Sequence, residues 1–159
     1  MSVSVEDLKH TWESIFRRKG GNGVYTRLFD DMSREQQDAL LGAVRLQETE
    51  VPVIGSFRGP DRWLILTSQR LVWSARGQRF ELDVQTIRDA TADLRHLANS
   101  QSKLEMESLQ VATLSGAEYA IELESGPPLS GTWNVLKNLG VRNRNANERS
   151  SVSSPSRAH

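Results

Sequence analysis

The sequence predicts an α+β fold, in which a curled antiparallel β-sheet is capped by a C-terminal helix and preceded by a helical extension. Three observations lead to this expectation. Residues 4–19 carry apolar side chains at helical spacing, residues 62–74 form two apolar, β-prone runs around a polar break, and residues 130–140 return to helical spacing. A chain of 159 residues can bury a core without a metal ion or a disulfide.

The N-terminal region predicts a small, all-helical unit that packs on the domain after it. Ser4 is the expected N-cap of the first helix, and the Gly-Gly-Asn-Gly sequence at 20–23 is expected to end it. A shorter helix is expected over residues 24–31. Ser33 then begins a Ser-x-x-Gln capping box, which predicts a third helix over residues 34–44.

The middle of the chain predicts an antiparallel meander. Alternating apolar residues over 51–57 indicate a half-buried strand, and the hairpin over 62–74 and a strand over 79–84 follow after short turns. The first hairpin arm is apolar throughout from Trp63 to Leu66, which is typical of a central strand covered on both faces.

The pattern is ambiguous over residues 85–101. One alternative is a helix, and the other is a strand over 86–92 followed by a loop; both fit the spacing of the apolar residues. Further strands are expected over 103–109, 110–114 and 119–123.

A terminal helix should then close the sheet. Its expected N-cap is Ser130, and Gly140 is expected to end it. From residue 141 the chain is polar and is expected to be a disordered tail.

The run Leu64-Ile-Leu-Thr67-x-x-Arg70-Leu-Val-Trp73 resembles the Leu-Thr-x-x-Arg-Leu signature of bacterial pleckstrin-homology-like (PH-like) domains, which GRAM domains share in related form. This resemblance implies a split barrel of two near-orthogonal sheets with the final helix at one open end. It divides the chain into a helical extension (1–47), a PH-like β domain (48–140) and a tail (141–159). Thr67 is expected to cap the hairpin turn and Arg70 to pair with a nearby carboxylate.

The composition restricts the classes of partner. Basic and acidic residues number 20 each, so no overall positive field exists to attract nucleic acid, and a local patch would be needed. The chain has no cysteine, which excludes thiol chemistry and disulfides. The first residues lack the features of a secretory signal, and no apolar run approaches the roughly 20 residues that span a bilayer. We therefore expect a cytoplasmic protein.

The search for catalytic and metal-binding motifs is negative. His10, His96 and His159 lack the spacing of metal ligands. The glycines at 55–59 fall at the wrong offset for a serine nucleophile elbow, and those at 20–23 lack the Lys-Ser/Thr of a phosphate-binding loop. We expect no enzymatic activity, no cofactor and no metal.

The apolar stripe of the first helix is one candidate partner-binding face, formed by Trp12 and Phe16 with the adjacent Arg17. The commoner role of such a stripe is to face the core. Arginines near the turns of the meander are candidate anion- or lipid-binding residues: Arg58, Arg62, Arg76 and Arg79. Interleaved acidic residues weaken their combined field.

These observations favour a non-enzymatic protein–protein interaction module that recognises its partner by a helical face or an exposed sheet edge. An adaptor and an immunity-type inhibitor of a toxin or effector are two versions of this expectation. The alternative is a peripheral domain that binds anionic phospholipids through the turn arginines.

Overall fold

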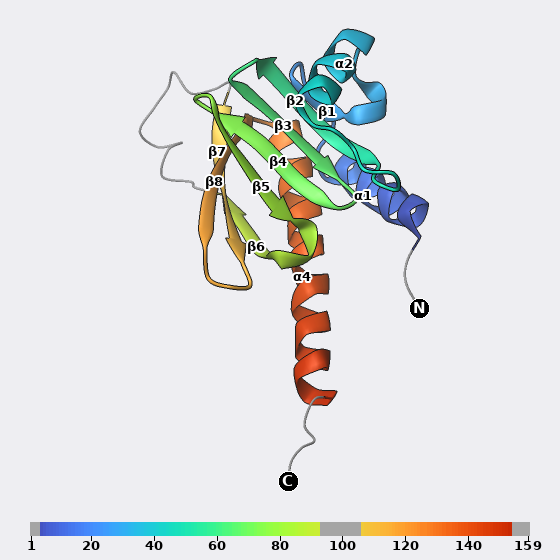
Figure 1. Cartoon of the computed structure of the whole chain (residues 1–159), viewed down its shortest axis with the longest axis vertical. Helices are drawn as coiled ribbons and strands as arrows, with labels where there is room; N and C mark the ends of the chain where they lie inside the picture. Colours follow the sequence, from blue (N-terminus) through green and yellow to red (C-terminus); the bar gives the residue numbers. More distant parts are fainter. Residues whose placement is uncertain (1–3, 93–105, 154–159) are drawn as a thin grey trace.

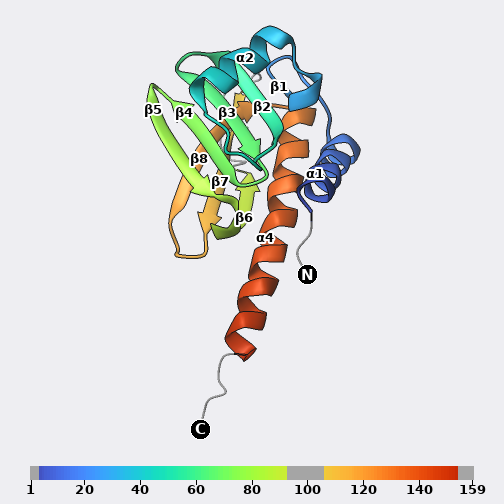
Figure 2. The same cartoon turned by 45° about the vertical axis from the view of Figure 1, so that its right-hand side comes forward.

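The computed structural model describes residues 4–92 and 106–153 as a mixed α+β fold (Figure 1). A five-stranded antiparallel sheet has the order β1-β2-β3-β4-β5, and a three-stranded antiparallel sheet has the order β6-β7-β8. Helix α4 lies between α1 and strand β6 (Figure 2). The two sheets do not close into one barrel, and their arrangement with a C-terminal helix is compatible with a PH-like fold.

The strands of the larger sheet are β1 (Thr26–Leu28), β2 (Pro52–Gly59), β3 (Arg62–Thr67), β4 (Arg70–Ala75) and β5 (Gln78–Asp83). Those of the smaller sheet are β6 (Ile87–Ala92), β7 (Met106–Thr113) and β8 (Glu118–Glu124). The helices are α1 (Val5–Lys19), α2 (Arg34–Ala43) and α4 (Pro127–Ser153), with 3₁₀ turns η1 (Phe29–Asp31) and η2 (Val84–Thr86).

The two N-terminal helices with capping signals form as predicted. The Ser4 side chain accepts a hydrogen bond from the Asp7 N–H at the start of α1, and Gly20 is its C-cap. At α2, Ser33 and Gln36 make the reciprocal bonds of a capping box. Local polar chemistry is sufficient to place these two helices.

The predicted helix over residues 24–31 is wrong, and the N-terminal region is not an all-helical unit. Strand β1 and the 3₁₀ turn η1 occupy this stretch, and β1 extends the larger sheet by pairing antiparallel with β2. The Thr26 hydroxyl donates to the Ser56 hydroxyl across this pair, and both side chains are buried. The Glu124 carboxylate accepts hydrogen bonds from three consecutive backbone N–H groups, those of Val24, Tyr25 and Thr26. Sheet pairing and this long-range carboxylate, rather than local spacing, determine the conformation.

The predicted meander is confirmed from β2 to β5. Each strand pairs antiparallel with the next, in the order of the sequence. The turn between β4 and β5 has positive φ at both central residues, 54° at Arg76 and 79° at Gly77. Such a two-residue turn matches the right-handed twist of a hairpin.

The ambiguous stretch after β5 forms the strand β6 as far as Ala92, and the remainder, from residue 93 to 101, lies outside the described residues. The two short strands predicted over 103–109 and 110–114 form the single strand β7, described from Met106. Strand β8 forms as predicted.

Helix α4 begins earlier and ends later than predicted. It starts at Pro127, a favoured first helical residue, and the Ser130 hydroxyl donates to the Lys19 carbonyl of α1 instead of capping the helix. It continues through Gly140 to Ser153, so residues 141–153 are helical where a disordered tail was expected. Its last turns project beyond both sheets (Figure 1).

Gly140 has a packing role within α4. A Cβ atom built there would lie 2.4 Å from the carbonyl oxygen of Arg88 on β6. The Trp133 indole donates to the Ala90 carbonyl, and the Asn143 amide donates to the carbonyls of Val84 and Ile87. Side chains of helix α4 therefore donate hydrogen bonds to backbone carbonyls along and just before β6. The close approach of the two backbones requires glycine at position 140.

We expect Gly140→Ala to lower the free energy of unfolding by about 1–3 kcal/mol, because the added methyl group overpacks a backbone contact. Gly42→Ala is the matched control, since Gly42 lies in α2 with open space around it and alanine favours a helix by about 1 kcal/mol. Urea denaturation followed by circular dichroism measures both. A Gly140 variant as stable as the wild type would contradict the close approach.

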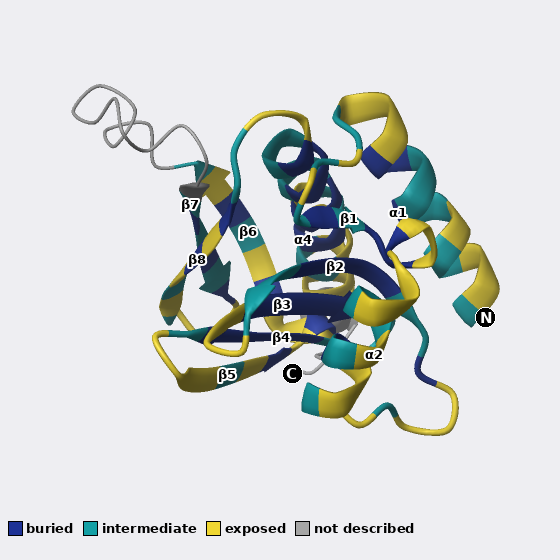
Figure 3. Ribbon diagram, turned by 90° about the horizontal axis from the view of Figure 1, so that it is seen from above, coloured by how far each residue is buried: buried dark blue, intermediate teal, exposed yellow. Residues whose placement is uncertain are grey.

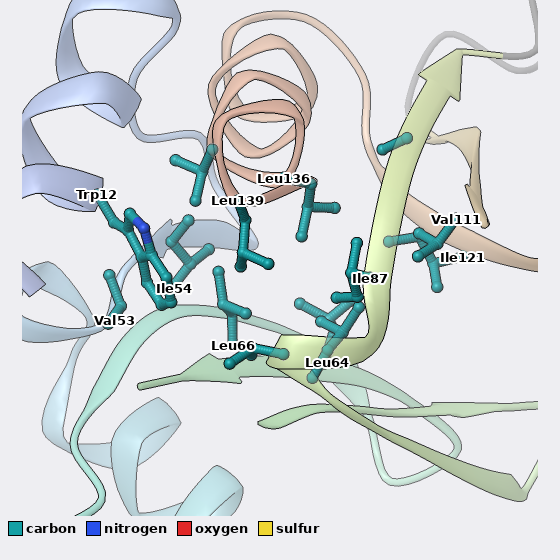
Figure 4. Packing of buried hydrophobic residues seen from close by; sticks show 14 of the residues in the cluster. Trp12, Val53, Ile54, Leu64, Leu66, Ile87, Val111, Ile121, Leu136 and Leu139 are labelled. Atoms are coloured by element: carbon teal, nitrogen blue, oxygen red, sulfur yellow. The ribbon is translucent and has the colours of Figure 1, made fainter. Parts of the chain in front are cut away.

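The main core lies between the two sheets and the paired helices. Trp12 of α1, Ile54 and Leu66 of the larger sheet, Ile87 of β6 and Leu139 of α4 meet in it (Figure 4). A second, smaller cluster lies on the other face of the larger sheet, under α2: Phe29, Met32, Leu40, Val44, Trp63, Ile65 and Val72. Strand β3 is thus covered on both faces, as its apolar sequence predicts. Among the described residues, no helix has both the length and the apolar character needed to cross a membrane.

Candidate functional site

The Thr-x-x-Arg segment of the central hairpin forms a hydrogen-bond network with a buried carboxylate. The Thr67 hydroxyl accepts hydrogen bonds from the N–H groups of Gln69 and Arg70 and donates to the carboxylate of Glu50. The Arg70 guanidinium forms two bonds to the same carboxylate, at 2.9 and 2.8 Å. The Glu50 side chain is fully buried. The predicted structural roles of Thr67 and Arg70 are confirmed, and Glu50 is the carboxylate partner.

The environment of Glu50 favours its ionised form. Burial alone would raise the pKa of this carboxyl. Hydrogen bonds from Arg70, Thr67 and the Gln47 N–H, together with the positive charge of Arg70, outweigh burial, so that the pKa of Glu50 lies below its usual value. This network connects the hairpin turn to the segment before β2, and its carboxylate is buried away from solvent.

The apolar stripe of α1 faces the core. Trp12 is 2% exposed and Phe16 is fully buried, and the ring of Phe16 packs against Gly131 of α4. Arg17, the third member of this candidate face, is exposed. In this structure Trp12 and Phe16 hold α1 on the molecule, and their side chains are not available to a partner.

The turn arginines do not converge on one site. Arg79 of β5 donates to the Ala43 carbonyl of α2 and lies 3.8 Å from the Glu81 carboxylate. Arg58 lies over the ring of Tyr25, with 4.3 Å between the guanidinium carbon and the ring centroid. Arg76 is exposed in the β4–β5 turn.

Arg58 and Arg62 line one crevice, together with residues of β4 and β8. Its volume is about 20 Å³, which holds roughly one water molecule, and the acidic Glu122 lies on its wall. A phosphate group needs several unopposed donors that converge. The arrangement therefore gives little support to anion binding by this group of residues.

Strand β5 is one of the two edge strands of the larger sheet, the other being β1. Within the described part of the chain, β5 pairs with β4 alone. The two-residue turn sets the bonding pattern, so Gln78, Phe80 and Leu82 exchange backbone bonds with β4. Arg79 and Glu81 direct their N–H and C=O groups outward. Figure 3 shows β5 along one side of the sheet, with mostly exposed residues.

A basic groove between α1 and α4 is a second feature. It has a volume of about 290 Å³, and Arg18 and Lys19 of α1 and Lys137 of α4 line it. The Arg17–Lys19 run is visible in the sequence, but its partner on α4 depends on how the two helices pack. For this reason the sequence did not predict the groove.

The described residues contain no group of three or more His, Cys, Asp or Glu side chains that could hold a metal ion. Comparisons with known proteins add no identification: no family model matches the chain, and no curated protein or solved structure does.

Proposed function

We propose that this protein is a non-enzymatic protein-interaction module with a PH-like fold, and that it binds a partner by adding an extended segment of that partner to the outer edge of β5. The PH-like assignment draws on the Thr67-x-x-Arg70 motif, the meander from β2 to β5, the second sheet and the terminal helix. An adaptor and an immunity-type inhibitor both fit this proposal.

The outward backbone groups of Arg79 and Glu81 carry the proposal. An incoming strand would bond to the N–H and C=O of both residues, and main-chain bonds of this kind supply affinity in strand addition. Strand β5 is six residues long and regular in its pairing with β4. It has no bulge of the kind that protects many edges.

The side chains around this edge give the partner a chemical preference. Phe80 stacks on Trp73, with 5.2 Å between the ring centroids, and Tyr119 of β8 meets both rings edge-on. A partner residue beside Phe80 on the inner side of the sheet would contact this aromatic group. On the opposite face of the sheet, which α2 partly covers, the side chains of Arg79 and Glu81 would lie beside the incoming strand with opposite charges. We therefore expect an extended segment with an apolar residue between polar or charged neighbours.

Glu81→Pro tests the edge directly. Proline removes the outward N–H and obstructs strand addition, while the bonds between β4 and β5 do not use that N–H. Glu81→Ala is the matched control, because it removes the same side chain and keeps the N–H. In a pull-down from native lysate, we expect the wild type and Glu81→Ala to retain a stoichiometric partner and Glu81→Pro to lose it.

The circular dichroism spectra of both variants must match that of the wild type for this comparison. Retention of the partner by a folded Glu81→Pro variant would contradict strand addition. Loss of the partner in both variants would show that the side chain, and not the edge, is recognised.

The alternative function is binding of anionic phospholipids through the turn arginines. Co-sedimentation with vesicles rich in phosphatidylserine distinguishes it from the protein-interaction proposal. We expect weak binding that the double substitution Arg58→Ala/Arg76→Ala does not change. Strong binding that this variant loses would favour the lipid alternative.

A further inference from the structure

The groove between α1 and α4 combines positive charge with an apolar surface. Arg18, Lys19 and Lys137 are its basic residues, and no carboxylate lines it. Ile15 and Val141 are its apolar residues, and Val141 is 44% exposed. Helices α1 and α4, whose residues line the groove, lie on a different side of the molecule from β5 (Figure 3).

The positive charge of the groove is not neutralised within the described part of the chain. There, none of the three basic side chains forms an ion pair with a carboxylate, and Lys137 instead lies 5.0 Å from the centroid of the Trp133 ring. Glu148 is the sole acidic residue in the sequence of α4. Although the chain has zero net charge, this face carries the local basic patch that an acidic partner requires.

The shape of the groove favours a chain segment over a compact anion. Its residues on α4 extend from Asn134 to Val141, which is about 10 Å along the helix axis at roughly 1.5 Å per residue. About three residues of an extended chain cover that length, at roughly 3.3 Å each. A single phosphate would leave most of the groove, including its apolar surface, unoccupied.

The position of the basic residues on α1 gives a second reason. Arg18 and Lys19 lie in the last turn of α1, where the helix dipole places partial negative charge. A compact anion held there would be close to the terminal carbonyls, whose partial negative charge repels it. A segment whose charges are spread along the groove also contacts Lys137 on the other helix.

We propose that this groove binds a short acidic segment of a partner protein, in which one apolar side chain lies between carboxylates. The apolar side chain contacts Ile15 and Val141, and the flanking carboxylates pair with Arg18, Lys19 and Lys137. This surface is distinct from the β5 edge, and binding there does not depend on strand addition.

The test uses the full chain and a labelled peptide, acetyl-Glu-Glu-Leu-Glu-Glu-amide, with fluorescence anisotropy as the readout. We expect saturable binding that weakens as salt increases. Arg18→Glu and Lys137→Glu should each weaken binding about tenfold, because each replaces an attraction by a repulsion, about 1.4 kcal/mol in total. Substitution of Ser for the peptide leucine, or Val141→Ser in the protein, should weaken it severalfold.

Arg17→Glu is the matched control, because Arg17 is exposed on the same helix and does not line the groove. It changes the net charge as Arg18→Glu does, and we expect little effect on binding. An equal loss in both variants would overturn the proposal, since it would indicate nonspecific attraction to a basic surface. Absence of peptide binding at low salt would also overturn it.

Two further probes distinguish other occupants. We expect inorganic phosphate not to displace the peptide beyond the effect of ionic strength. We expect vesicles rich in phosphatidylserine not to bind in a manner that depends on Lys137. Displacement by phosphate, or vesicle binding that Lys137→Glu abolishes, would contradict the proposal and would indicate that the groove binds a phosphate-bearing ligand instead.

Discussion

Replacement of Glu50 by alanine should lower the free energy of unfolding by about 3–5 kcal/mol, the usual loss when one partner of a buried ion pair is removed. The variant leaves Arg70, whose side chain is 14% exposed, without its bidentate partner, and it removes the acceptor of the Thr67 hydroxyl. Urea denaturation measures the loss. Glu81→Gln is the control, because Glu81 also lies near Arg70, at 3.4 Å, but is 47% exposed, and it should cost less than about 1 kcal/mol.

The same carboxylate should give a recognisable pH dependence. Because the pKa of Glu50 is lowered in the folded protein, its ionisation stabilises the fold above the unfolded pKa of about 4.3, and this stability is lost as the pH falls through the folded pKa. The difference in unfolding free energy between the wild type and Glu50→Gln should therefore be constant from about pH 6 to 8 and shrink in acid. A difference that stays constant into strong acid would contradict a lowered pKa.

The second large effect is expected at the contact between α1 and α4. Phe16→Ala should lower the free energy of unfolding by about 3–5 kcal/mol, because it empties a fully buried position. Its ring packs so closely on Gly131 that a Cβ there would lie 2.7 Å from the ring atom Cδ2. Calorimetry should show one cooperative transition at a lower temperature.

Arg17→Ala, at the neighbouring exposed position, should change stability by less than about 0.5 kcal/mol. If α1 were instead a detachable docking helix, Phe16→Ala would leave the main transition unchanged and would weaken partner binding. The pair of variants therefore separates a core role of the stripe from a recognition role.

Much of the fold is predictable from local patterns. The capping residues Ser4 and Ser33 place α1 and α2. The alternating apolar residues of β2 and β5 and the continuous apolar runs of β3 and β4 place the meander. The hairpin signature also predicts a carboxylate partner for Arg70. In each case the information lies within a few residues of the element.

The errors occur where distant residues determine the conformation. The segment that leads into β1 has helical spacing, but the carboxylate of Glu124, about a hundred residues away, accepts hydrogen bonds from the N–H groups of residues 24–26. Gly140 resembles a helix end, whereas its role is to let α4 approach the Arg88 carbonyl. The basic groove likewise needs two helices from opposite ends of the chain. Tertiary contacts override local preference at these positions.

The most direct test of the central proposal is amide hydrogen exchange of the full chain, alone and with its captured partner. Strand addition predicts slower exchange at the outward N–H groups of Arg79 and Glu81 in the complex, with little change at Phe80, whose N–H already bonds to β4. Unchanged exchange along β5, with new protection confined to other elements, would contradict the account.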